Sequence, residues 1–194
     1  MTLQSTIKPL ESGGFSNPPQ QSARAFRAIM QAMARPGQVE KISGATPPAP
    51  LSPAAGTLAL VLLDQTTPLW LAPSHDTPEL RAWLTFHTGA PFAPAHEALF
   101  AIGTWAALNP VDRFAIGTPE YPDRAATLIV ELTALAQDGP RLTGPGIRHE
   151  AQLSLPEIAA FQANRQLYPL GFDTFFAAGE QIAGLPRSTI VEAR

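Results

Sequence analysis

The segment ATLIVEL, residues 126–132, is the strongest strand signal in the sequence. Its apolar character is nearly continuous instead of alternating, which is typical of a strand that is covered on both faces. Strands of this kind occur mostly in α/β proteins, where helices pack on the two sides of a sheet. The segment therefore favours an α/β fold.

Weaker strand signals flank this segment on both sides. They fall at residues 38–43, 69–71, 98–102, 173–177 and 189–191. The apolar run 58–63 suits a buried strand or a buried helix, and Ser52-Pro53 before it favours a helix. The order of elements predicts a three-layer α/β/α domain with a mixed sheet over residues 17–194. Residues 1–16, which contain Gly13-Gly14, are expected to form a flexible N-terminal arm.

Three amphipathic segments have clear helix boundaries. The first begins at Asn17-Pro18, with Gln20 placed to complete a capping box, and ends at Arg35-Pro36-Gly37. The second begins at Thr77-Pro78 and ends at Gly89, and the third spans residues 155–166. The first helix has one apolar stripe at helical spacing, which suits packing or an adaptable interface and consists of Phe26, Ile29, Met30 and Met33.

Composition excludes several classes of function. The chain has 194 residues, a net charge of -3 and no basic block, so we expect no nucleic-acid partner. It has no cysteine, which removes disulfides, thiolate nucleophiles and cysteine-held metals. The N-terminus lacks the apolar core of a signal peptide, and no apolar run is long enough to span a membrane. We therefore expect a cytoplasmic protein with no membrane contact.

No motif in the sequence defines a reaction. The four histidines form neither HxH nor HExxH, so no metal site is predicted. Only Lys8 and Lys41 are available for a Schiff base, and neither lies in an apolar segment, so no pyridoxal phosphate is expected. The segment LTGPGI, residues 142–147, lacks the spacing of a nucleotide-binding loop and is interpreted as a tight turn between strands. We expect no cofactor and assign no catalytic residue.

A few single residues remain candidates for a cleft or an interface. Arg35 lies at the end of the first helix, and Arg187 enters the last strand, where it suits a phosphate, a carboxylate or an inter-subunit salt bridge. His87 lies on the apolar face of its helix, which favours a hydrogen-bonded core histidine over a ligand. Asp64 either serves chemistry or caps the turn at Thr66 and Thr67. The glycines of the GPGI turn complete the set: Gly144 and Gly146.

Four segments together resemble the PhnH family, the H subunits of the bacterial carbon–phosphorus lyase core complex. They are GFSNPPQQSARAFRAIMQAMARPG (14–37), LLDQTTPLWL with WLTFHTG (62–71 and 83–89), LTGPGI (142–147), and YPLGFDTFF through LPRSTIV (168–191). These segments occur in order across nearly the whole chain. The resemblance rests on their combination, since GPGI alone is uninformative.

The resemblance implies a function that the residues alone do not. Members of this family have a fold similar to that of pyridoxal-phosphate-dependent transferases, without the cofactor. They are homodimers that associate with G, I and J subunits in a phosphonate-degrading assembly. That assembly transfers an alkylphosphonate onto the ribose of a nucleoside triphosphate with release of the purine, and its J subunit later breaks the carbon–phosphorus bond.

Three hypotheses follow, and the third, a degenerate cofactor enzyme that still binds pyridoxal phosphate, is disfavoured by the lack of a buried lysine. The first is a structural or co-catalytic subunit of this transferase assembly, without activity alone. The second is a stand-alone nucleotide- or phosphonate-binding enzyme with a cleft built from Arg35, Asp64, His87 and Arg187. The first requires tight binding to partner subunits, and the second requires saturable ligand binding by the isolated chain.

Overall fold

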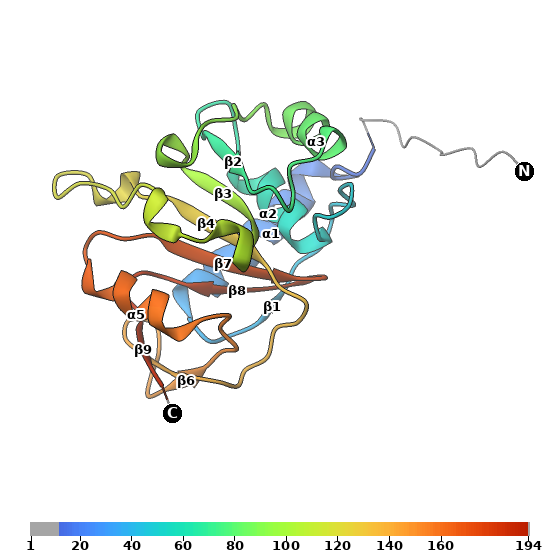
Figure 1. Cartoon of the computed structure of the whole chain (residues 1–194). Coiled ribbons are helices and arrows are strands. Elements are labelled where there is room, and N and C mark those ends of the chain that lie inside the picture. The colour runs from blue at the N-terminus through green and yellow to red at the C-terminus, as the bar shows by residue number, and fades with distance from the viewer. Residues whose placement is uncertain (1–11, 194) are drawn as a thin grey trace, which may run out of the picture.

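The computed structural model of the chain describes residues 12–193 and has mixed α/β content (Figure 1). Its main sheet has six strands in the order β1-β8-β7-β4-β3-β2. The bounds are β1 Glu40–Lys41, β2 Leu69–Leu71, β3 Phe100–Thr104, β4 Thr127–Glu131, β7 Asp173–Ala178 and β8 Gln181–Leu185. Strands β2, β3, β4 and β7 are parallel, whereas β8 and β1 are antiparallel to their neighbours. The sheet is therefore mixed, as the sequence predicts.

Strand β4 is covered on both faces. Ile129 packs into one hydrophobic cluster, and its neighbours Leu128 and Val130 pack into the other. All three are fully buried. The interpretation of ATLIVEL as a doubly covered strand is confirmed.

Different elements cover the two faces of the sheet (Figure 1). Helices on one face are α1 Pro18–Ala34, α2 Pro53–Leu62 and α3 Pro78–Thr88. The other face carries α4 Trp105–Leu108, α5 Ile158–Gln166 and a small sheet of β5 Arg141–Thr143, β6 Ala151–Gln152 and β9 Ile190–Glu192. Short 3-10 helices occupy connecting segments at Ala95–Glu97, Val111–Arg113 and Pro122–Arg124. Figure 1 shows α3 beside β2 at one end and β6 and β9 at the opposite end.

The predicted boundaries of the first two amphipathic helices hold, whereas the helix predicted over 155–166 begins only at Ile158, as α5. Helices α1, α2 and α3 each begin at the proline that follows the N-cap position, where Ser52 and Thr77, but not Asn17, cap with their side chains, and α3 ends at Gly89 with φ +69°. The apolar run 58–63 lies mainly in α2, as Ser52-Pro53 predicts. The capping box of α1 is formed differently, because the side chain of Gln21, and not that of Gln20, accepts the N–H of Asn17 at 2.7 Å.

The apolar stripe of α1 is divided between the core and the solvent. The helix buries Ala25, Ile29 and Ala32 against the sheet. Phe26 and Met30 point outward and are about half exposed. Close packing causes this choice of face, because a Cβ added to Gly184 of β8 would lie 2.6 Å from the Ala32 carbonyl oxygen. Only small side chains fit at such a crossing.

Part of the expected N-terminal arm contacts the body of the protein. The indole Nε1 of Trp83 donates to the carbonyl of Ser12 at 3.0 Å. The carbonyl of Gly13 accepts the N–H of Thr46 at 2.8 Å. Residues 1–11 of that arm lie outside the described residues. Residues 12–16 therefore lie against α3 and the loop that precedes α2.

Candidate functional site

Three of the candidate residues lie together at the C-terminal end of α1. Arg35 is the residue that follows the helix, and its N–H donates to the Gln31 carbonyl at 2.9 Å. A Cβ added to Gly146 would overlap the Ala34 carbonyl oxygen, and one added to Gly144 would lie 3.3 Å from the carbonyl oxygen of Ser188. The turn between β5 and β6 therefore packs closely between the end of α1 and the segment before β9. Its glycines fit because both have a positive φ, +126° and +83°.

The guanidinium of Arg187 is held within the chain. It donates to both carboxylate oxygens of Asp173, with Nη2 at 2.6 Å from Oδ2 and Nε at 3.1 Å from Oδ1. Its Nη1 donates to the Pro122 carbonyl at 2.8 Å. The Arg187 side chain is only 12% exposed, so these contacts leave it little surface for a ligand. Arg187 fastens the end of β8 to the start of β7.

His87 lies far from this cluster. His87 packs on Trp83 and lines a hollow of about 460 Å³ with Gly14 and with Pro18 at the start of α1. Helix α1 has 17 residues, so its two ends are about 25 Å apart. The structure therefore does not bring His87 and Arg35 into one cleft.

Asp64 is a turn residue. Its carboxylate accepts the N–H and the hydroxyl of Thr66, each at 2.7 Å. These hydrogen bonds hold the pKa of Asp64 below its ordinary value. The capping interpretation of Asp64 is confirmed.

His87 is half-buried, and its Nε2 has no hydrogen-bond partner within residues 12–193. The expected hydrogen bond of a core histidine is therefore missing at that atom.

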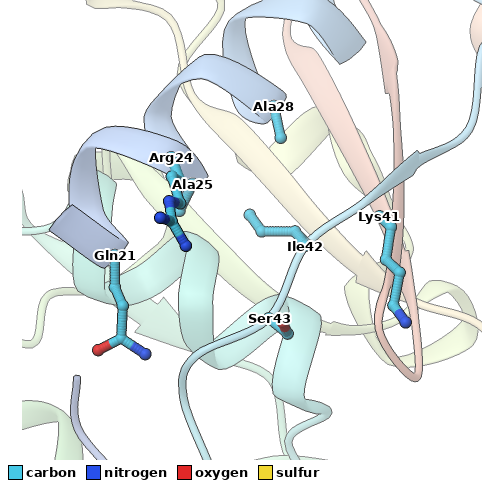
Figure 2. Close-up of a pocket in the computed structure, with 7 residues that line it drawn as sticks. All are labelled: Gln21, Arg24, Ala25, Ala28, Lys41, Ile42 and Ser43. Atoms are coloured by element: carbon cyan, nitrogen blue, oxygen red, sulfur yellow. The ribbon is translucent and has the colours of Figure 1, made fainter. Parts of the chain in front are cut away.

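A groove of about 330 Å³ runs between α1 and the segment that contains β1 (Figure 2). Ala25, Ala28 and Ile42 line its apolar part. Figure 2 shows Arg24 near one end, while the ammonium of Lys41 points away from it. Instead, Nζ of Lys41 lies 3.3 Å from Oε2 of Glu180, and the Lys41 side chain is 77% exposed. The groove therefore has one guanidinium at its rim, not a pair of cations converging on a phosphate.

The carboxyl ends of the parallel strands carry polar groups that the sequence did not reveal. Ligands of open α/β sheets commonly bind at this edge. Here, however, the groups bond to one another: the Ser74 hydroxyl accepts the Thr104 N–H at 3.2 Å and lies 2.9 Å from Nδ1 of His75. The carboxylate of Glu131 accepts the Ser52 N–H at 2.7 Å. This edge therefore joins α2 and the loop after β2 to the sheet.

Burial changes the pKa of two groups at this edge. It lowers the pKa of His75 and so favours the neutral imidazole. It raises the pKa of Glu131, against the opposing effect of the Ser52 hydrogen bond.

Within residues 12–193, no three histidine, cysteine, aspartate or glutamate side chains are placed to share a metal ion. Of the two lysines, Lys8 lies outside the described residues, and Lys41 is exposed and paired with Glu180. A Schiff-base lysine is normally activated by burial or by a neighbouring cation, and Lys41 shows neither feature. No helix in the described part of the chain is long and apolar enough to cross a membrane.

The fold and these sites define a mixed α/β protein whose candidate residues lie at several separate positions and not in one cleft. Residues 13–192 match the family model described as bacterial phosphonate metabolism protein (PhnH). The chain is 40% identical, over 99% of its length and 99% of the relative, to the alpha-D-ribose 1-methylphosphonate 5-triphosphate synthase subunit PhnH of Rhizobium meliloti (strain 1021). The chain belongs to the PhnH family.

A second relative carries a related name. It is the putative C-P lyase subunit protein HtxG of Stutzerimonas stutzeri, 29% identical over 88% of this chain and 85% of that protein. Both names describe subunits, which agrees with the absence of an assembled catalytic centre among the candidate residues.

Proposed function

We propose that this protein is a subunit of the carbon–phosphorus lyase core complex in organophosphonate degradation. In this role it supports transfer of an alkylphosphonate onto the ribose of a nucleoside triphosphate with release of the purine. The observation that carries the proposal is the 40% identity, over almost the whole of both chains, to the ribose 1-methylphosphonate 5-triphosphate synthase subunit of Rhizobium meliloti.

The geometry supports a structural or co-catalytic role. The guanidinium of Arg187 is occupied by Asp173, and His87 lies at the opposite end of α1 from Arg35. Gly144 and Gly146 lie in a tight junction at the end of α1, and the exposed Arg35 lies beside it, which suits an interface. We assign these three residues to contacts with partner subunits, and we expect no activity from the chain alone.

Finer parts of the proposal follow from the family. We propose that the protein is a cytoplasmic homodimer without a cofactor and that its partners are the G, I and J subunits. We also propose that its fold is a three-layer relative of the pyridoxal-phosphate-dependent transferases. The mixed sheet with helices and a small sheet on its faces is compatible with that architecture.

Co-purification tests the subunit role. The chain is tagged, produced together with the G, I and J subunits, and isolated by the tag. We expect all the subunits to elute together from a sizing column. Elution of this chain without any of them would contradict the proposal.

Calorimetry tests the stand-alone alternative. The isolated chain is titrated with ATP, GTP and methylphosphonate, and the titration is repeated with Arg35→Ala and Arg24→Ala. We expect no saturable heat. Saturable binding that either substitution abolishes would instead assign a ligand site to this chain. Arg187→Ala is a poor probe here, because it also breaks the contact with Asp173.

A further inference from the structure

Helix α1 presents an unusual face to the solvent. Phe26 is 50% exposed and Met30 is 52% exposed, although both are large apolar side chains. They are one helical turn apart and therefore adjacent on the surface. The buried face of the helix instead carries Ala25, Ile29 and Ala32, two of which are small. The helix thus leaves two large apolar side chains in water. An exposed apolar patch marks a contact surface when neighbouring residues extend it.

The same helix is basic and has no acidic residue. Residues 12–39 contain Arg24, Arg27 and Arg35 but no aspartate or glutamate, whereas the whole chain has a net charge of -3. Within the described part of the chain, no ion pair involves any of these three guanidiniums. A hollow of about 400 Å³ is lined by Gln20, Ala23, Arg24 and Arg27. A hollow between two guanidiniums suits a carboxylate.

We propose that the outer face of α1 docks this protein onto a different subunit of the complex, at an apolar pocket bordered by carboxylates. The residues of this face are all exposed: Ala23, Arg24, Phe26, Arg27, Met30 and Ala34. Phe26 and Met30 enter the pocket, and Arg24 and Arg27 meet its carboxylates. The inference rests on the proposed function, since it requires the assembly to form.

Charge decides between a different subunit and a second copy of this chain. In a two-fold symmetric dimer the same patch faces itself. The α1 face has arginines and no acid, so two copies would bring like charges together around Phe26 and Met30. Like charges opposed across an interface are unfavourable. A partner with carboxylates around an apolar pocket satisfies both features of the face.

The test measures binding of this chain to the assembly of the other subunits, purified without it. Because Phe26 and Met30 are exposed, Phe26→Ser with Met30→Ser should leave the fold intact, which a thermal melt checks. We expect this variant to bind at least about 30-fold more weakly, as for residues at the centre of an interface. The matched control is Phe86→Ser on α3, which removes a side chain that is 56% exposed, and binding should stay within about twofold.

Charge reversal tests the contribution of the arginines separately from that of Phe26 and Met30. We expect Arg27→Glu to weaken binding at least about tenfold and more than Arg27→Ala does.

Three results would overturn the inference. The first is unchanged binding of the Phe26/Met30 variant while the unmodified chain binds. The second is a change in the oligomeric state of the isolated variant without a loss of partner binding, which would assign the face to a second copy. The third is failure of the unmodified chain to bind the assembly, which would also remove the proposed function.

Discussion

Arg187 and Asp173 form the best-enclosed ion pair among the described residues, with side chains 12% and 27% exposed. Removing one partner of such a pair leaves the other charge without its counterion. We predict that Arg187→Ala and Asp173→Ala each lower the free energy of unfolding by about 2 kcal/mol. Urea denaturation of the two variants and the double variant measures the loss and the coupling.

The pair Lys41–Glu180 is the matched control, because its side chains are 77% and 50% exposed. Solvent screening should reduce the effect of Lys41→Ala to less than about 1 kcal/mol. Equal losses at the two sites would contradict a structural role for Arg187.

Gly184 sets the distance between β8 and α1. We predict that Gly184→Ala lowers the free energy of unfolding by about 1–3 kcal/mol, because its Cβ would press on α1. The obstructing atoms are backbone atoms of Ala32 and Met33, so Met33→Ala should not restore stability. Differential scanning calorimetry of the single and double variants measures both effects. Full recovery in the double variant would show that the side chain, and not the backbone, is the obstacle.

Glu131 should make stability depend on pH in a defined direction. Burial raises its pKa in the folded protein above the ordinary value of 4.5. The folded state then holds this proton more tightly than the unfolded state. The resulting stabilisation is complete below about pH 4.5 and is lost as the pH rises through the raised pKa.

We predict that Glu131→Gln, which keeps an acceptor for the Ser52 N–H, removes this dependence. Relative to the unmodified protein, the variant should gain stability as the pH rises from about 4 towards about 7, because Glu131 loses its proton in this range. Urea denaturation of both proteins across the range measures the difference. A constant difference would exclude a raised pKa.

At the scale of single elements, the helix caps differ in a way that can be measured. Ser52 accepts the N–H of Ala55 at 3.1 Å, and Thr77 accepts that of Leu80 at 3.2 Å. The side chain of Asn17 makes no capping hydrogen bond. We predict that Ser52→Ala and Thr77→Ala each lower the free energy of unfolding by about 1 kcal/mol, and that Asn17→Ala costs clearly less. An equal loss at Asn17 would contradict this assignment of the caps.

The sequence predicts helix ends better than helix faces. Proline after a capping residue and glycine after the last turn act locally, so the starts of α1, α2 and α3 were predictable. Which face of α1 is buried depends instead on the nearby backbone of β8. That strand, with the sequence QIAGL, was not predicted, because its small residues have a low strand propensity. It forms a strand through its antiparallel pairing with β7, which the sequence alone does not reveal.

For the candidate residues too, local contacts could be predicted from the sequence and long-range contacts could not. The turn cap was one of the two roles that the sequence allowed for Asp64, because its hydrogen bonds are local. The ion pair of Arg187 with Asp173 and the contact of Gly146 with Ala34 join segments far apart in the chain. No local pattern indicates such contacts. The signal for the α1 face was present, however, as an acid-free stretch with three arginines in a chain of net charge -3.

At the scale of the whole molecule, the family gives this chain a role as a subunit in phosphonate metabolism. The six-stranded sheet holds α1 by a close contact at Gly184, and on the opposite side of that helix Phe26 and Met30 are about half exposed. At the carboxyl edge of the sheet, Glu131 bonds to Ser52 and Ser74 to Thr104, while Nε2 of the buried His75 has no partner among the described residues. The molecule therefore presents an apolar and basic helix on its surface, which suits the proposed contact with a partner subunit.

Purine release by the reconstituted complex tests the central claim most directly. The G, I and J subunits are assembled with and without this chain and supplied with a nucleoside triphosphate and methylphosphonate. The account predicts that release of the free purine falls to the background level without the chain and returns when the purified chain is added. Undiminished release in its absence would contradict the claim that this protein is a working subunit of the synthase.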